Sequence, residues 1–290
     1  MDFNLTQRPI KFKYLTKDKE YTPEKVMEIF KICFFSNKFF SRFNNIIIFH
    51  IKIILINIYM QNYFNILNIP ENITHIKIDV GLGMNNIQSQ NWLKNESNLF
   101  IFMFDPNTDS INSSINNMNN YNNIINNNKN SFHIIPVALS NVKEEQQLEF
   151  YSMQIDGGTS SLYKPLNERL GPVKNKNIVK TYSLKHFFDL FPWERFEYIE
   201  YIKIDAQGAD IDIIKSAGDY LRERVVYITA EPEYTDYENC SNNTSENMEE
   251  YLLTQNFIKI NHPNTEDPTF INKKFIELKD KIYIFQKTYL

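Results

Sequence analysis

A glycine-bearing acidic segment and a later aspartate are the first residues of this chain that could do chemistry. The segment runs from Asp79 to Gly83 (DVGLG), follows a short apolar run and precedes a helical pattern. Its glycines let the backbone turn tightly and approach a ligand, and the N-terminus of the following helix offers unpaired N–H groups. Asp105 ends the next apolar run about two dozen positions later. This arrangement suits a nucleoside cofactor whose ribose hydroxyls bind the second carboxylate.

Two classes of nucleoside cofactor share this arrangement, and the charge of Asp79 separates them. A dinucleotide site prefers a third glycine where this chain has Asn86. The Asp79 carboxylate would face a pyrophosphate badly, whereas it would attract the ammonium and sulfonium groups of S-adenosylmethionine. We therefore predict S-adenosylmethionine as the cofactor, with a nicotinamide-dependent oxidoreductase as the less favoured alternative. The predicted cofactor-binding residues from this argument are Asp79, Gly81, Gly83 and Asp105.

Two further carboxylates end later apolar runs. Asp205 ends the run 198–205, and Glu231 ends the run 225–231. Ligands of α/β proteins collect at the carboxyl ends of parallel strands, so we predict that Asp205 deprotonates or aligns an acceptor hydroxyl, with Glu231 as second choice. Asp205 would also suit the N-cap of the following helix. The two carboxylates could alternatively hold a divalent cation through oxygen ligands, but we predict no metal site.

Motifs between residues 79 and 210 add a family resemblance. In chain order they are Asp79-Val80-Gly81, Phe104-Asp105-Pro106-Asn107, Val137-Ala138-Leu139-Ser140, Gly158-Thr159-Ser160-Ser161-Leu162 and Lys203-Ile204-Asp205-Ala206-Gln207-Gly208-Ala209-Asp210. With these motifs the chain resembles the FkbM-type methyltransferases, which are S-adenosylmethionine-dependent enzymes with a Rossmann-like fold that mostly methylate hydroxyls, often of sugars. The resemblance covers about residues 74–290, and its most specific part is the block 203–210.

The resemblance implies an O-methyltransferase that acts on a hydroxyl of a sugar, a glycan or a small metabolite. It also implies that Ala138 lies in the cofactor site. The chain departs from the commonest pattern at several positions, which are Asn85, Asp105, Gln207 and Asp210. Gln207 stands where glutamate is common, so this position offers no catalytic base.

The segment between the third and fourth predicted strands contains the candidate acceptor site. Its loop 156–161 is rich in glycine and hydroxyl groups, and we predict substrate contacts from Ser160, Ser161 and, on a following helix, His186. No His/Asp pair accompanies these serines, which disfavours nucleophilic catalysis. Since the acceptor depends on the shape of the loops around 153–182, the sequence does not identify it.

Alternating strand and helix patterns begin at His75. The predicted strands are 75–80, 98–104, 132–139, 198–205, 225–231, 257–261 and 281–287, with two further strands at 147–153 and 177–182. The predicted helices are 86–95, 109–128, 183–191, 209–221 and 244–255. Together with the resemblance, this pattern predicts an α/β protein with the Rossmann-like class I methyltransferase fold. We expect a mostly parallel seven-stranded sheet with an antiparallel last strand, helices on both faces and an N-terminal helical extension.

The predicted division is a helical extension over 1–70 and a Rossmann-like methyltransferase domain over 71–290. The segment 46–60 is the most apolar, but it is only 15 residues long and contains His50 and Lys52, whereas a membrane-spanning helix needs ~20 apolar residues. Polar residues from His50 to Asn68 recur at helical spacing. We therefore predict a packed helix rather than a membrane anchor.

Composition excludes several protein classes. The chain has 290 residues, of which 42% are hydrophobic and 23% charged, and this excludes disordered and fibrous proteins. The formal net charge of −4 argues against binding to a nucleic-acid backbone. Two cysteines in no metal or redox spacing, with no signal-peptide pattern, predict a cytoplasmic protein. The sequence leaves open whether the protein forms a homo-oligomer. It also leaves open an alternative function, a non-catalytic Rossmann-like module that binds a protein or nucleic acid.

Overall fold

The structure is a computed structural model that describes residues 64, 68–166, 168–261 and 267–281. The chain divides into two compact units, Met1–Met60 and Gln61–Leu290. The predicted helix over 46–60, and the extension to which it belongs, lie outside the described residues apart from a few positions after 63. The predicted boundary at residue 70 stays a prediction.

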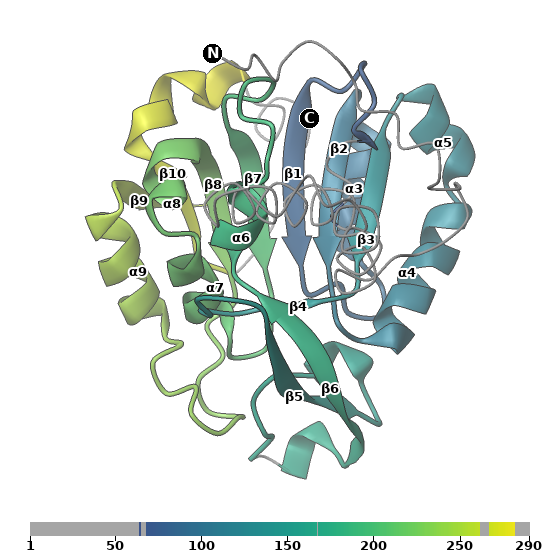
Figure 1. Cartoon of the computed structure of the whole chain (residues 1–290), viewed down its shortest axis with the longest axis vertical. Coiled ribbons are helices and arrows are strands. Elements are labelled where there is room, and N and C mark those ends of the chain that lie inside the picture. The colour runs from purple at the N-terminus through teal and green to yellow at the C-terminus, as the bar shows by residue number, and fades with distance from the viewer. Residues whose placement is uncertain (1–63, 65–67, 167, 262–266, 282–290) are drawn as a thin grey trace, which may run out of the picture. The chain divides into compact units, whose positions relative to one another are not determined.

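A seven-stranded sheet is the centre of the described fold, with the strand order β3-β2-β1-β7-β8-β10-β9 (Figure 1). Its strands are β1 His75–Val80, β2 Leu99–Phe104, β3 Ser131–Ile135, β7 Ile199–Ile204, β8 Val225–Ala230, β9 Phe257–Ile260 and β10 Thr269–Asn272. β1 pairs in parallel with both β2 and β7. β10 runs antiparallel to both β8 and β9. The predicted Rossmann-like sheet with an antiparallel last strand is confirmed.

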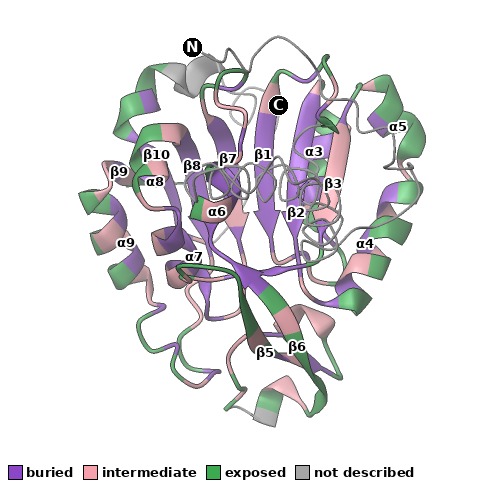
Figure 2. Ribbon diagram, viewed as in Figure 1, coloured by how far each residue is buried: buried purple, intermediate pink, exposed green. Residues whose placement is uncertain are grey.

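Both faces of this sheet are covered, which explains why its strands read as continuous apolar runs. On β2, Ile101 belongs to a buried cluster with Trp92 of α3 (Ile87–Asn95). The next residue, Phe102, points to the other face, where its ring lies 4.8 Å from that of Phe187 on α6 (Leu184–Phe188). Figure 2 shows the central strands as buried, in contrast to the outer faces of the helices.

The other described α-helices are shorter than their predicted counterparts. They are α4 Thr108–Asn119, α5 Asn122–Asn127, α7 Asp210–Ser216, α8 Asp219–Arg224 and α9 Ser245–Thr254. The predicted helix 109–128 is interrupted after Asn119, in a segment whose asparagines have low helix propensity. The predicted helix 209–221 is interrupted at Gly218, which has a φ of 58°. In the described part of the chain, no helix is long and apolar enough to cross a membrane.

A three-stranded sheet makes up most of an insertion, residues 138–182, between β3 and α6. Its strands are β4 Ala138–Leu139, β5 Gln146–Met153 and β6 Val173–Tyr182, and the short helix η3 (Gly157–Thr159) follows β5. The predicted strand 132–139 is divided between the two sheets because Pro136 has no N–H for a ladder. Figure 1 shows the β5–β6 hairpin projecting beyond the carboxyl ends of β1 and β7.

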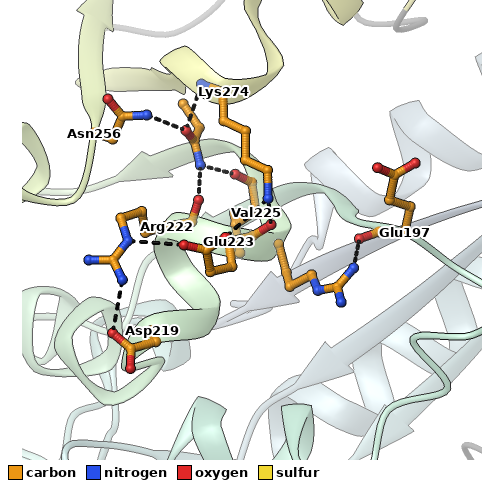
Figure 3. A network of polar contacts seen from close by, with 9 residues as sticks. Glu197, Asp219, Arg222, Glu223, Val225, Asn256 and Lys274 are labelled. Atoms are coloured by element: carbon orange, nitrogen blue, oxygen red, sulfur yellow. Dashed lines mark hydrogen bonds and ion pairs between the residues drawn. The ribbon is translucent and has the colours of Figure 1, made fainter.

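The last described strand, β10, is one that the sequence did not predict. The predicted strand 281–287 lies outside the described residues apart from Lys281, which ends the 3₁₀ helix η5 (Lys273–Lys281). β10 contributes just four residues, and its position depends on the buried side chain of Asn272. The Asn272 amide donates to the carbonyls of Arg222, at 2.8 Å, and Val225, at 3.0 Å. Figure 3 shows the surrounding contacts, in which Lys274 also reaches Glu223.

We expect Asn272→Ala to lower the free energy of unfolding by about 2–3 kcal/mol, because it leaves one buried and one partly buried carbonyl without their amide donor. Denaturant unfolding measures the change. Asn247→Ala is the matched control, since the Asn247 side chain is exposed and its amide bonds one carbonyl at 3.0 Å. Equal losses in both variants would contradict an anchoring role for Asn272.

Candidate active site

A cavity lies at the carboxyl ends of β1, β2 and β7, where the insertion covers the sheet. It contains about 480 Å³ of empty space, including open solvent at its mouth. The described residues that line it are Val80, Gly81, Gly83, Phe104, Asp105, Pro106, Asn107, Val137, Ala138, Leu139, Phe150, Gly157, Gly158, Ser160, Leu162, Asp205, Ala206, Ala209 and Ile213. Six of the ten predicted site residues are therefore brought together: Gly81, Gly83, Asp105, Ala138, Ser160 and Asp205.

Gly81 occupies the closest approach between the ends of β1 and β7. Its φ is +77°, and a Cβ atom built on it would lie 1.7 Å from the carbonyl oxygen of Asp205. The Asp205 N–H donates to the Val80 carbonyl at 2.9 Å, which fixes the two strand ends together. Gly83, with a φ of +55°, faces Gly158 of the insertion across the cavity wall. Close approach of two backbones requires glycine at position 81, whereas at Gly83 it is the positive φ that favours glycine.

Asp79 lies beneath this loop rather than in the cavity wall. Its carboxylate accepts a hydrogen bond from the Ser89 hydroxyl of α3. Its second oxygen, Oδ1, has no hydrogen-bond partner in the described chain and lies 4.0 Å from Lys203 Nζ. Burial raises the pKa of Asp79, although Lys203 and Ser89 oppose the shift. A direct contact between Asp79 and the cofactor stays a prediction.

Asp105 follows β2 and is held by two backbone donors. Its Oδ2 accepts from the Leu82 N–H at 2.9 Å, and its Oδ1 accepts from the Asn107 N–H at 2.7 Å. Burial raises the pKa of Asp105 to about 6, so the carboxylate is ionised at neutral pH. Each oxygen keeps a lone pair for another donor. This carboxylate is thus fixed in the cavity wall with acceptor capacity to spare.

Asp205 faces the cavity with its charge fixed by Lys203. The Lys203 ammonium donates to Asp205 Oδ2 at 3.0 Å and to the Gly81 carbonyl at 3.1 Å. Burial alone would raise the pKa of Asp205, but Lys203, together with hydrogen bonds from Glu231 and Gln207, holds it below its usual value. The side chain is 33% exposed, so an ionised carboxylate remains accessible to a ligand.

Glu231 is paired with Asp205 and carries a proton. Burial and the neighbouring Asp205 carboxylate raise the pKa of Glu231 to about 9. Gln207 joins the two groups, since its Nε2 donates to Asp205 Oδ1 at 2.7 Å and to Glu231 Oε2 at 3.1 Å. Unlike Asp205, Glu231 is not among the described lining residues. The N-cap of α7 is Ala209, so Asp205 does not cap this helix as its position suggested.

The three predicted substrate residues differ in position. Ser160 lines the cavity, and its hydroxyl accepts from the Asn107 amide at 3.2 Å. Ser161 is buried and donates to the Gln207 carbonyl at 2.7 Å, which joins the insertion to the turn after β7. His186 is not among the lining residues; its ring lies against the Ser183 hydroxyl at the N-terminus of α6. A contact between His186 and an acceptor stays a prediction.

A comparison with protein-family models shows the family of this chain. The methyltransferase FkbM domain model matches residues 85–259, well over half of the chain. The chain belongs to the FkbM methyltransferase family. A search of curated proteins gave no match.

The FkbM match includes most of the cavity. It contains Asp105, Ala138, Ser160, Asp205 and Glu231, and it begins just after the loop that holds Gly81 and Gly83. The predicted FkbM resemblance is therefore confirmed at the level of the family. The assignment of individual residues to the cofactor or the acceptor is not part of that match.

Sequence reasoning gave no site role to three residues that contact the candidate site: Lys203, Gln207 and Tyr237. Lys203 could have been found, because it lies two positions before Asp205 on a strand and so points to the same face. Tyr237 has no such signal, since it comes from the loop after β8 and its hydroxyl reaches the Thr159 carbonyl at 2.7 Å. Within the described residues, no group of three or more His, Cys, Asp or Glu is arranged to hold a metal ion.

Proposed function

We propose that this protein is an S-adenosylmethionine-dependent methyltransferase that modifies a hydroxyl of a sugar, a glycan or a small metabolite. The observation that supports this most is the charge of the cavity. Its described lining contains two carboxylates, Asp105 and Asp205, and neither Lys nor Arg. S-adenosylmethionine carries a sulfonium cation, which such a cavity attracts. The pyrophosphate of a nicotinamide dinucleotide would be repelled by the same two groups.

The residues of the cavity fit the parts of this cofactor. Asp105 would hold the ribose hydroxyls with the lone pairs that its two backbone donors leave available. The apolar wall formed by Phe104 and Val137–Leu139 would pack against the adenine. The turn at Gly81 and Gly83 would let the methionine end approach the backbone. When bound, the cofactor supplies an electrophilic methyl group.

Asp205 is the group that would act on the acceptor. Positioning supplies much of the rate of an in-line displacement, and a base adds on the order of 10²–10⁴-fold for an alcohol acceptor. Asp205 is ionised and reaches the cavity, so its carboxylate can take up the hydroxyl proton. Glu231 is already protonated at neutral pH, which favours Asp205 over Glu231 as the base.

Calorimetry with S-adenosylmethionine, S-adenosylhomocysteine and NAD tests the cofactor. We expect saturable binding of the first two and no binding of NAD. Saturable binding of NAD alone would favour the oxidoreductase instead. Transfer of a labelled methyl group to a panel of sugars and hydroxylated metabolites tests the reaction. Cofactor binding without transfer to any member would favour a non-catalytic module.

We expect Asp105→Ala to weaken S-adenosylhomocysteine binding roughly 10- to 100-fold, as loss of hydrogen bonds to a charged acceptor predicts. The pKa of Asp105 is about 6, and its ionised form is the better acceptor, so wild-type affinity should be higher at pH 7 than at pH 5. This pH dependence should be weaker in Asp105→Ala.

Asp109→Ala is the control for this experiment. Asp109 lies four residues further along, is exposed, and pairs with Lys174 at 2.6 Å rather than lining the cavity. Its loss should leave affinity within about twofold of wild type, which is a change of at most about 0.4 kcal/mol. An Asp105→Ala affinity as high as that of this control would mean that Asp105 serves only to fix the loop.

A further inference from the structure

Gln207 lies at the centre of the polar contacts behind the cavity. It occupies the turn after β7 with a φ of 52°. One side-chain nitrogen, Nε2, contacts the carboxyl groups of both Asp205 and Glu231, at 2.7 and 3.1 Å. Its side-chain oxygen, Oε1, lies 3.0 Å from the hydroxyl of Tyr237. A single amide thus contacts three side chains from two loops.

Asp205 and Tyr237 together set which way this amide points. An ionised carboxylate only accepts, so Asp205 requires the donor Nε2 on its side, which places Oε1 toward Tyr237. The tyrosine is 2% exposed, and its hydroxyl lies between Gln207 Oε1 and the Thr159 carbonyl. The hydroxyl supports this orientation when it donates its one proton to Oε1.

We propose that Gln207 is a positioning residue that holds Asp205 and Glu231 together as a pair sharing one proton, with the proton on Glu231 and the negative charge on Asp205. The use of this charge to receive an acceptor proton rests on the proposed function; the pair itself does not. A carboxylate at position 207 would offer no donor to either group.

The charges around Asp205 and Glu231 explain why the shared proton lies on Glu231. Lys203 donates to Asp205 Oδ2 at 3.0 Å, whereas the described ion pairs include none to Glu231. Two further acids, Asp210 from α7 and Asp267 from the segment before β10, disfavour ionisation of Glu231. Burial and the Asp205 charge raise the pKa of Asp210 to about 7, so it titrates between the two steps of the pair. Asp79, from β1, lies 4.0 Å from the same Lys203, and the Asp205 charge contributes to the raised pKa of Asp79. Negative charge is thus stabilised on Asp205 alone.

Carbon-13 NMR of protein labelled at the Asp and Glu carboxyl carbons tests this inference without cofactor or acceptor. In the wild type, we expect one step of the pair below the usual aspartate range and one near pH 9. Glu231→Gln and Asp205→Asn assign the signals. The two carboxyl groups are coupled, so neither titration step belongs to one residue alone. Both steps are therefore followed in every variant.

In Gln207→Met, both steps should move to higher pH by about one unit or more, since each ionised form loses a donor. Methionine has a similar length and, like glutamine, a β-carbon, so the positive φ affects both residues alike. Tyr237→Phe should cause a smaller shift in the same direction, because it frees the amide to turn. Gln255→Met is the control; this amide contacts the Thr254 hydroxyl and should leave both steps in place.

Steps in Gln207→Met that stay within about 0.3 units of wild type would overturn the inference and leave Gln207 as a space-filling residue. If Gln207→Met does not fold, Tyr237→Phe decides, and wild-type titration in that variant would overturn the inference. Failure to bind S-adenosylmethionine would instead contradict the proposed function. Once an acceptor is known, the acid limb of the turnover profile should shift with the lower step.

Discussion

Asp205→Asn is expected to lower methyl-transfer turnover by roughly 10²-fold or more, the range for loss of a positioned base. The substitution keeps the size of the side chain but removes the charge that Lys203 fixes at the cavity. S-adenosylhomocysteine affinity should change by less than about threefold, or 0.7 kcal/mol, because the acceptor and not the cofactor is expected to contact Asp205. Turnover and affinity measured on the same preparation separate these two effects.

Stability measurements show whether Asp205→Asn loses turnover through its chemistry or through a loss of folded protein. Asparagine has one acceptor oxygen where Asp205 offers two, so either Lys203 or the Gln207 amide loses its partner. The expected loss of unfolding free energy is about 1–2 kcal/mol. Asp219→Asn is the control, since this side chain is 90% exposed and pairs only with Arg222 at 3.4 Å in the described chain. It should leave both turnover and stability unchanged.

Two other outcomes would reassign the roles. Turnover of Asp205→Asn within about twofold of wild type, outside the range for a lost base, would remove Asp205 from catalysis and move Glu231 to first place. Loss of wild-type activity with a chelator would favour a metal held by the carboxylates. We expect no effect of the chelator.

Burial explains which parts of the fold could be predicted from the sequence. β1 has the predicted bounds, and β2 differs by one residue, because strands covered on both faces give apolar runs that end where burial ends. β10 was missing from the prediction because it is too short to give such a run. β10 has only four residues, TFIN, and its position comes from the contacts of Asn272 rather than from a periodic pattern.

In the candidate site, too, some residues could be predicted from the sequence and others could not. Gly81, Asp105 and Asp205 could be found because each directly follows a strand, and parallel strands bring their carboxyl ends together. The helix that holds His186 was also predicted, but not the contact with Ser183 that turns its ring toward the helix N-terminus. The link between Gln207 and Tyr237 joins loops 30 residues apart, and no local pattern encodes it.

Gly81→Ala is expected to abolish S-adenosylhomocysteine binding and to destabilise the protein by about 3 kcal/mol or more. A β-carbon at this position would lie 1.7 Å from the Asp205 carbonyl oxygen, so β1 and β7 would have to separate. The left-handed backbone adds about 1–2 kcal/mol for any residue with a β-carbon. Denaturant unfolding and calorimetry measure the two effects.

Gly218→Ala separates backbone strain from the steric overlap. Gly218 has a φ of +58°, but a β-carbon there would meet only the flexible end of Lys185, at 3.8 Å. This variant should therefore lose just the strain energy, about 1–3 kcal/mol for a β-carbon at this φ and its ψ of −143°, and should bind S-adenosylhomocysteine normally. If Gly81→Ala behaved like Gly218→Ala in both measurements, the approach of β1 to Asp205 would not control the site. The larger loss is expected because separating these strand ends moves Asp205, the Gly81 carbonyl that Lys203 binds, and the cavity wall together.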